Sequence, residues 1–354
     1  MSAVPNRPFF PAFASGWVAN PRWDLTWLCG SALLVLIPPI AHTYWKVGAT
    51  GIDLLVTLMI GGPHMYATFL RTVLEPRFRQ KHPVLAWLPL VVVPTFVILG
   101  AVFAFDALLS FFFLWASLHI CDQASFVASR YRARTGEPTR FERLLDFSVA
   151  LSALYVVAIY RFVDGSFVIS DHVIWFPPFL KAMWFARLFA FGTAALIAYW
   201  AVRSWNQFRR GSLGGPYFLF MILTMGVGIA VPTMKELSVS FQGFNAWHSF
   251  QYLGLTFLVL NQRETAGTVT LGFVRALARP GRFFRYYGWN VLLTTGAGFI
   301  VAGLTYGMHL PTERCYYAVV LSFLLVHYFH DHLLFSDSTE GVAAQRSSSS
   351  LSIG

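Results

Sequence analysis

Residues 84–104 read VLAWLPLVVVPTFVILGAVFA and contain no charged side chain. A helix of about 20 apolar residues crosses the ~30 Å hydrocarbon core of a bilayer, because each residue adds about 1.5 Å along the helix axis. Inside a bilayer every backbone N–H and C=O group must find a hydrogen-bond partner, and apolar runs of this length meet that requirement as helices. The stretch therefore predicts a transmembrane helix.

Comparable apolar runs recur along the whole chain. Of 354 residues, 56% are hydrophobic and 12% are charged, against roughly 25% charged in an average soluble domain. The sequence predicts an all-α, polytopic helical bundle of about ten transmembrane helices, with its membrane domain over 25–335, a cytoplasmic segment over 1–24 and a Ser-rich cytoplasmic tail over 336–354. The predicted spans are 25–45, 52–70, 84–104, 107–128, 145–162, 183–202, 216–232, 236–262, 289–308 and 315–335. Polar residues interrupt the start of 236–262, so a later start at Asn245 is the alternative there.

Basic residues are distributed unevenly between the two sides of this arrangement. With the N-terminus inside, the inner segments contain twenty of the 26 Lys and Arg residues, the outer segments contain five, and Arg187 falls within a span. Cytoplasmic loops of membrane proteins carry this excess, so both termini are predicted inside, in the cytoplasmic membrane of a bacterium. Basic loops that face an anionic lipid leaflet explain the net charge of +10 without a nucleic-acid partner.

Six of the ten histidines lie in the even-numbered spans, which all run from outside to inside: His64, His119, His248, His327, His330 and His332. The first four are each twelve residues from the outer start of their span, a depth of about 18 Å. Ionisable groups inside a membrane are costly and mark functional sites. A single buried histidine is ordinarily a helix contact, so the prediction of a metal or cofactor site depends on the four occurring at one depth.

Polar side chains accompany three of these histidines one turn further along the helix, where they share a face with the imidazole. The pairs are Asp122 and Gln123 after His119, Gln251 and Tyr252 after His248, and His330 and Asp331 after His327. Metal sites combine imidazole ligands with carboxylates and amides that bind or orient. We predict metal ligands at His64, His119, His248, His327, His330 and Asp331, cofactor-binding side chains at Gln123 and Gln251, and catalytic groups at Tyr252 and Asp122.

The donor set favours some metals over others. Cys29, Cys121 and Cys315 lie in separate spans without CxxC spacing, which argues against thiolate chemistry. A site of imidazoles and carboxylates fits iron, zinc, copper or manganese. Zinc would favour hydrolysis with Asp122 or Asp331 as base, whereas nitrogen-rich ligation beside an apolar interior favours non-haem iron and O₂.

Gly62-Pro63-His64 is similar to the start of the GxPHGxxDH motif of the Brp/Blh-type carotene dioxygenases, polytopic membrane proteins in which dispersed histidines bind one non-haem iron. The resemblance covers these residues and the general architecture. The chain departs from the motif at once, because residues 65–69 lack its glycine and its closing Asp-His pair. The resemblance implies a membrane non-haem iron oxygenase.

The sequence thus predicts a membrane-embedded oxidoreductase of the oxygenase, hydroxylase or desaturase type. Its predicted partners are membrane lipids, a lipid-soluble substrate and an electron donor. Two alternatives stay open. One is a transporter that moves protons or metal ions, although no matching half-sequences are found. The other is a haem-binding electron-transfer protein, because His248 and Tyr252 at i, i+4 resemble the pattern of haem–copper oxidases.

The charge distribution yields the first testable prediction. The loop 129–144 should lie on the cytoplasmic side. In a chain whose three native cysteines are replaced, a cysteine introduced as Arg134→Cys should react with a membrane-impermeant maleimide only after the membrane is opened. Labelling in intact cells, or a C-terminal fusion reporter active only outside the membrane, would contradict this orientation.

Overall fold

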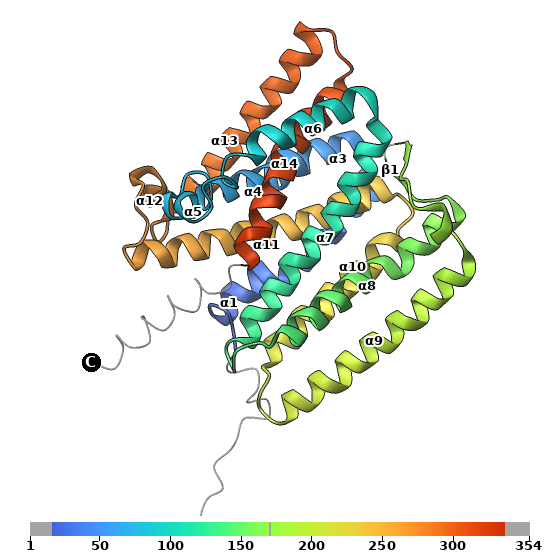
Figure 1. Cartoon of the computed structure of the whole chain (residues 1–354), viewed down its shortest axis with the longest axis vertical. Coiled ribbons are helices and arrows are strands. Elements are labelled where there is room, and N and C mark those ends of the chain that lie inside the picture. The colour runs from blue at the N-terminus through green and yellow to red at the C-terminus, as the bar shows by residue number, and fades with distance from the viewer. Residues whose placement is uncertain (1–15, 170, 337–354) are drawn as a thin grey trace, which may run out of the picture. The chain divides into compact units, whose positions relative to one another are not determined.

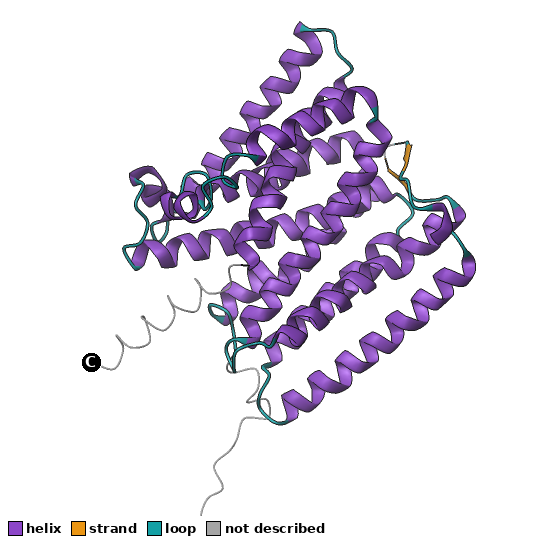
Figure 2. Cartoon of the chain, in the orientation of Figure 1, coloured by secondary structure: helices purple, strands orange, loops and turns teal. Residues whose placement is uncertain are grey.

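The computed structural model describes residues 16–169 and 171–336 and is almost entirely helical there (Figures 1 and 2). The predicted tail, apart from Ser336, lies outside the described residues, as do residues 1–15. The one small sheet among the described residues pairs β1 (Val168–Ile169) with β2 (His172–Val173). The helical segments, with short 3₁₀ and π turns labelled η, are α1 (Pro21–Asp24), η2 (Leu25–Cys29), η3 (Gly30–Leu36), α2 (Ile37–Trp45), α3 (Ala49–Val56), η4 (Thr57–Gly61), α4 (Gly62–Ala67), η5 (Thr68–Leu70), α5 (Pro76–Lys81), α6 (Pro89–Phe103), α7 (Phe105–Arg132), α8 (Arg140–Asp164), η6 (Pro178–Leu180), α9 (Met183–Arg209), α10 (Gly215–Thr233), α11 (Leu237–Thr265), α12 (Gly272–Ala278), α13 (Phe283–Ala302), η7 (Gly303–Gly307) and α14 (Thr312–Ser336).

Seven helical stretches in the described part of the chain are long and apolar enough to cross a membrane, which confirms the all-α fold class and agrees with a membrane protein. Three predicted spans do not meet that standard. The span 52–70 is broken into α3, η4, α4 and η5, and the span 84–104 shortens to the 15 residues of α6. α11 is long, but its polar side chains lower its hydropathy. The helix begins at Leu237, eight residues before the alternative start at Asn245. The seven stretches are Pro21–Trp45, Phe105–Arg132, Arg140–Asp164, Met183–Arg209, Gly215–Thr233, Phe283–Gly307 and Thr312–Phe335.

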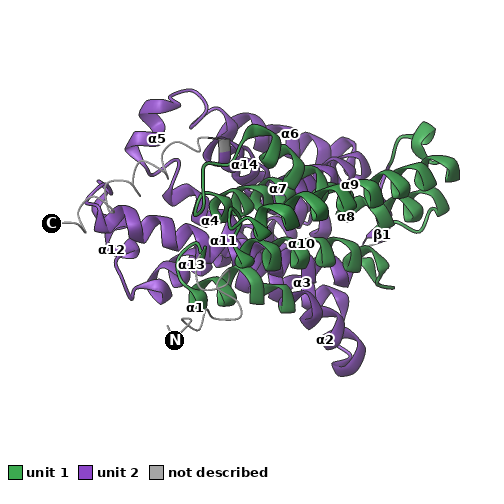
Figure 3. Cartoon of the chain, turned by 90° about the horizontal axis from the view of Figure 1, so that it is seen from below, with its two compact units in different colours: residues 1–33, 120–168, 176–237 green, residues 34–119, 169–175, 238–354 purple. Residues whose placement is uncertain are grey.

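The chain divides into two compact units, coloured separately in Figure 3. Unit 1 comprises 1–33, 120–168 and 176–237, and unit 2 comprises 34–119, 169–175 and 238–354. In unit 1, α8 packs against α9 and α10. In unit 2, α14 packs against α6 and α13, and α4 lies against α13 and α14. All the histidines predicted as ligands fall in unit 2.

A buried ion pair organises unit 1. The Arg132 guanidinium donates from Nε to Oδ2 of Asp146 at 2.8 Å and from Nη2 to Oδ1 at 3.0 Å. The Tyr217 hydroxyl donates to the same carboxylate at 2.6 Å. Because breaking such a pair leaves a buried charge uncompensated, these contacts fix which faces of α7, α8 and α10 meet. Arg132 is therefore held inside the unit by its contacts with Asp146.

The turn before α4 brings backbones close together in unit 2. Pro63 lacks an N–H group, and the π turn η4 immediately precedes it. A Cβ atom on Gly61 would lie 2.9 Å from Nδ2 of Asn245, and one on Gly62 would overlap the Thr294 side chain of α13. Glycine at both positions therefore lets this segment reach α11 and α13.

We expect Gly62→Ala to destabilise the folded protein by about 1–3 kcal/mol, because the added methyl group has no space beside Thr294. The matched control is Gly296→Ala on α13, where an added Cβ meets no atom within 4 Å. Thermal midpoints measured by size-exclusion chromatography in neutral detergent would compare the two variants. Equal midpoints would contradict the close approach of α4 and α13 at Gly62.

Candidate metal centre

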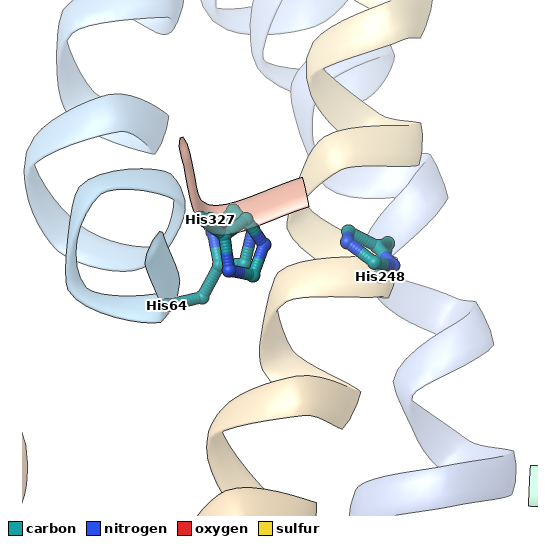
Figure 4. A group of neighbouring side chains, drawn as sticks. All are labelled: His64, His248 and His327. Atoms are coloured by element: carbon teal, nitrogen blue, oxygen red, sulfur yellow. The ribbon is translucent and has the colours of Figure 1, made fainter. Parts of the chain in front are cut away.

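Four helices of unit 2 bring four histidines together. His64 comes from α4, His119 from α7, His248 from α11 and His327 from α14, and no side chain among them is more than 3% exposed. Figure 4 shows the His64 and His327 rings beside each other, with His248 on the neighbouring helix. The helices that hold these side chains are far apart in sequence, so the cluster exists only in the folded chain.

The four imidazole rings form a closed cycle of neighbours. The ring centroid of His64 lies 5.3 Å from that of His248 and 4.7 Å from that of His327. The ring of His119 completes the cycle, at 5.0 Å from His248 and 4.8 Å from His327. Neighbouring rings meet at 68–89°. Each neighbouring pair therefore meets edge to face rather than stacked.

The ligand atoms of these side chains fall into two overlapping groups. One contains His64, His248 and His327, the other His119, His327 and Asp331, and within each group the atoms lie within 4.8 Å of one another. A tetrahedral site with bonds of about 2 Å places its ligand atoms about 3.4 Å apart. Ring movements on the order of 1 Å would bring the atoms to that spacing.

Hydrogen bonds at Nδ1 fix the orientation of the His64 ring. Its Nδ1 lies within hydrogen-bond distance of the Gly61 carbonyl oxygen and 2.9 Å from Oγ of Ser249. A carbonyl oxygen only accepts, so Nδ1 carries the proton and donates. In a neutral imidazole the other nitrogen, Nε2, then presents a lone pair, which is the form that binds a metal.

A chain of hydrogen bonds continues from Ser249 along α11 to a carboxylate on α3. Ser249 donates to Oδ1 of Asn245 at 2.9 Å, and Asn245 donates to Oε1 of Gln242 at 3.3 Å. The Gln242 amide donates in turn to the Asp53 carboxylate. Every donor in this series of hydrogen bonds points away from His64. The Ser249 hydroxyl is therefore left to accept from His64, which favours a proton on Nδ1 of the imidazole.

His327 is held by a second polar group. Its Nδ1 lies 2.5 Å from Oγ1 of Thr68 and 3.5 Å from Oδ2 of Asp331. Thr68 donates to Oδ1 of Asp331 at 3.0 Å, and the Tyr252 hydroxyl donates to the same oxygen at 2.6 Å. Because the Thr68 proton is used on Asp331, Nδ1 of His327 is the donor to Thr68. Its Nε2 is then the bare nitrogen, as in His64.

The remaining nitrogens test whether a metal fits. Among the described residues, Nε2 of His64, His119 and His327 is buried and has no hydrogen-bond partner. A buried acceptor left unpaired costs about 1–3 kcal/mol, so three in one cluster point to an absent partner. Imidazole nitrogen is a ligand for iron, zinc and copper. The residues present therefore fit a transition-metal ion held by His64, His248 and His327, or by His119, His327 and Asp331.

The other predicted site residues occupy different surroundings. His330 is buried, but its Nε2 lies 3.2 Å from the Leu85 carbonyl oxygen and its Nδ1 lies 3.4 Å from Thr72. The structure therefore places His330 outside the four-ring cycle. Asp331 and Tyr252 lie beside the cycle, with the Tyr252 ring centroid 5.1 Å from that of His327.

The predicted roles of three amide and carboxylate groups stay predictions. Gln251 is buried on α11 of unit 2. Gln123 is buried and Asp122 is partly buried. Both follow His119 by one turn along α7, in the part of that helix assigned to unit 1.

The sequence interpretation missed the residues that orient the histidines: Thr68, Ser249, Asn245, Gln242 and Asp53. A signal for some of them is present in the sequence. Gln242, Asn245, Ser249 and Tyr252 recur at intervals of three and four residues, which places them on one helical face. We counted the first of these as interruptions at the start of a span. Thr68 gives no such signal, because its partners come from α11 and α14.

Comparison with known proteins adds no further assignment. No protein-family model, curated protein or solved structure matches the chain. The resemblance to Brp/Blh-type dioxygenases therefore stays a prediction from a few residues and the architecture.

The hydrogen-bond chain behind His64 leads to a prediction about metal affinity. Ser249→Ala and Asp53→Asn should each weaken metal binding about 10–100-fold, because groups that orient a ligand typically contribute that much. Iron affinity would be measured by competition with a chelator of known strength. Asp171→Asn, an exposed carboxylate in a loop, is the matched control. Affinities unchanged by both substitutions would show that the chain does not orient His64.

Proposed function

We propose that this protein is a membrane-embedded, metal-dependent oxidoreductase that uses non-haem iron and O₂ on a lipid-soluble substrate. The observation that carries the proposal is the buried cycle of four imidazole rings, His64, His119, His248 and His327, with neighbouring centroids 4.7–5.3 Å apart. We therefore narrow the predicted ligand set to the four rings of this cycle. His330 is left out, and Asp331 is given the role of orienting His327.

The geometry favours a non-haem centre over haem. A porphyrin supplies four nitrogens of its own around the iron, and protein ligands bind above and below that plane. Four imidazoles that surround one region occupy the positions that a porphyrin ring would need. Three cysteines that are free and buried in the described structure, none of them in either ligand group, agree with a nitrogen-rich site.

When bound, iron would supply the activation of O₂, which apolar substrates do not react with unaided. The chain's own residues bind the ion, orient the ligands and exclude water. His64 and His327 each donate a proton from Nδ1 to an oxygen, which keeps Nε2 directed inward. Burial of all four rings to 3% exposure or less keeps bulk water from the reacting region, where it would compete for the metal or quench reactive species.

The reaction class determines the partner. A dioxygenase transfers both oxygen atoms to the substrate and needs no external electrons. A hydroxylase inserts one oxygen atom and reduces the other to water with two electrons from a donor. A desaturase reduces both atoms to water with two electrons from the substrate and two from a donor, so both classes require the proposed electron-transfer partner. Placement of the whole domain in a bilayer agrees with a substrate that is dissolved there.

We also propose ten membrane crossings, with both termini inside the cytoplasmic membrane of a bacterium. The three crossings beyond the seven apolar stretches would be the segment from α3 to η5, α6, and α11. The polar face of α11 lowers its hydropathy, but Ser249, His248 and Tyr252 on that helix are buried. Such a helix crosses a bilayer when its polar groups face the interior of the bundle.

The proposal predicts the consequence of removing single ligands. His248→Ala and His327→Ala should each remove iron and O₂-dependent turnover, while the protein still inserts into the membrane, because a catalytic metal site needs its full set of first ligands. Iron content would be measured by plasma mass spectrometry on detergent-purified protein, and O₂ uptake with lipid extracts. Gln251→Ala should weaken both readouts without abolishing them.

His309→Asn provides the matched control, because His309 is exposed and lies at positive φ, where asparagine is tolerated. It should retain iron and turnover. Purified protein without a transition metal, or full activity in both alanine variants, would contradict the oxidoreductase proposal. A Soret absorption band would instead indicate haem, and metal uptake into proteoliposomes would indicate transport.

A further inference from the structure

Arg71 is a buried cation beside the candidate metal centre. It follows directly on η5, and its backbone N–H donates to the Thr68 carbonyl oxygen at 2.9 Å. The residue is only 8% exposed. Placing a guanidinium in an apolar interior is costly unless hydrogen bonds and a counter-charge compensate it. The buried guanidinium of Arg71 therefore needs hydrogen-bond acceptors or an anion close to it.

The protein itself offers Arg71 little compensation. In the described part of the chain, its Nε and Nη1 atoms are buried without a hydrogen-bond partner. No carboxylate there forms an ion pair with it within 4.0 Å. Glu75, one turn further on, is engaged elsewhere, since Arg263 lies 3.2 Å from its carboxylate. Among the described residues, three N–H groups of Arg71, one on Nε and two on Nη1, are thus buried without an acceptor.

The position of Arg71 links it to the candidate metal centre. Arg71 lies three residues after Thr68, whose hydroxyl donates to Asp331 at 3.0 Å and lies 2.5 Å from Nδ1 of His327. Asp331 and Tyr252 belong to the polar group that holds His327 through Thr68. An anion bound at Arg71 would therefore lie within a few side chains of the imidazole cycle.

We propose that Arg71 binds the singly charged oxyanion head group of an amphiphilic substrate. Arginine is the preferred residue for buried carboxylate and phosphate groups, because its planar N–H donors match their oxygens. A single unpaired cation matches a single negative charge, whereas a doubly charged phosphate would bring a second buried charge without a partner. This inference names the substrate class of the proposed enzyme and therefore rests on the proposed function.

The test is direct binding, which needs no turnover. Radiolabelled hexadecanoate and uncharged hexadecanol would be titrated onto the purified full-length protein in neutral detergent. Charge-assisted hydrogen bonds of this kind correspond to about a tenfold to hundredfold change in affinity. We expect Arg71→Gln to weaken hexadecanoate binding by at least tenfold and to leave hexadecanol binding unchanged. Arg77→Gln, which removes the same charge from an exposed position six residues away, should change neither.

Two further arms identify the ligand and guard against a folding defect. Phosphatidylglycerol, whose phosphodiester is also singly charged, competes with hexadecanoate if the natural ligand is a phospholipid, and fails to compete if it is a free acid. Arg71→Lys keeps the charge and should lose less affinity than Arg71→Gln, with both variants monodisperse in size-exclusion chromatography. Equal affinities of acid and alcohol for the native chain, or hexadecanoate binding unaffected by Arg71→Gln, would overturn the proposal.

Metal content measured on the same preparations separates this inference from the proposed function. Protein that lacks metal but shows Arg71-dependent acid binding would remove the oxidoreductase and keep the anion site. Protein that contains iron but binds acid and alcohol alike would keep the oxidoreductase and remove the anion site.

Discussion

Imidazoles in an apolar interior must have their N–H groups bonded, and much of unit 2 is arranged around that requirement. The Nδ1 protons of His64 and His327 are directed to oxygens of Gly61, Ser249 and Thr68. Because a neutral imidazole has one proton, satisfying Nδ1 determines that Nε2 is bare. The same hydrogen bonds that permit burial therefore prepare the rings to bind a metal. In His119, stacking on Tyr328 at 4.1 Å helps to fix the ring.

The backbone of unit 2 follows from the same requirement. The Ser249 hydroxyl reaches His64 because the start of α4 lies close to α11, and Gly61 permits that approach beside Asn245. Pro63 and the π turn before it turn the imidazole toward the interior at the cost of a regular helix. The segment that the sequence presents as one span is consequently the least regular part of the unit. This irregular segment carries His64, one of the proposed metal ligands.

The sequence indicated the depth of the histidines along their helices better than it indicated the hydrogen-bond partners of their rings. Span positions predicted from apolar runs placed His64, His119, His248 and His327 at one level, since four helices in the same direction share a reference surface. The sequence could not show which rings turn inward. His330 lies on the same face of α14 as His327 by spacing, yet its nitrogens are turned to Leu85 and Thr72. Contacts such as Thr68 with Asp331 join residues more than 250 positions apart, and no local pattern encodes them.

Charge around the centre connects the metal proposal to the anion proposal. Four neutral imidazoles contribute no charge, so a divalent cation held by them would rely on Asp331, whose single negative charge is shared with Thr68 and Tyr252. Arg71 adds one positive charge to the same interior, so the positive charge of Arg71 and a bound metal together would exceed the one negative charge that Asp331 can supply. Buried charge of one sign is costly. An acidic ligand reduces that charge, whereas a neutral one does not, so the proposed metal and the proposed head group favour each other's binding through the electrostatics of a shared interior.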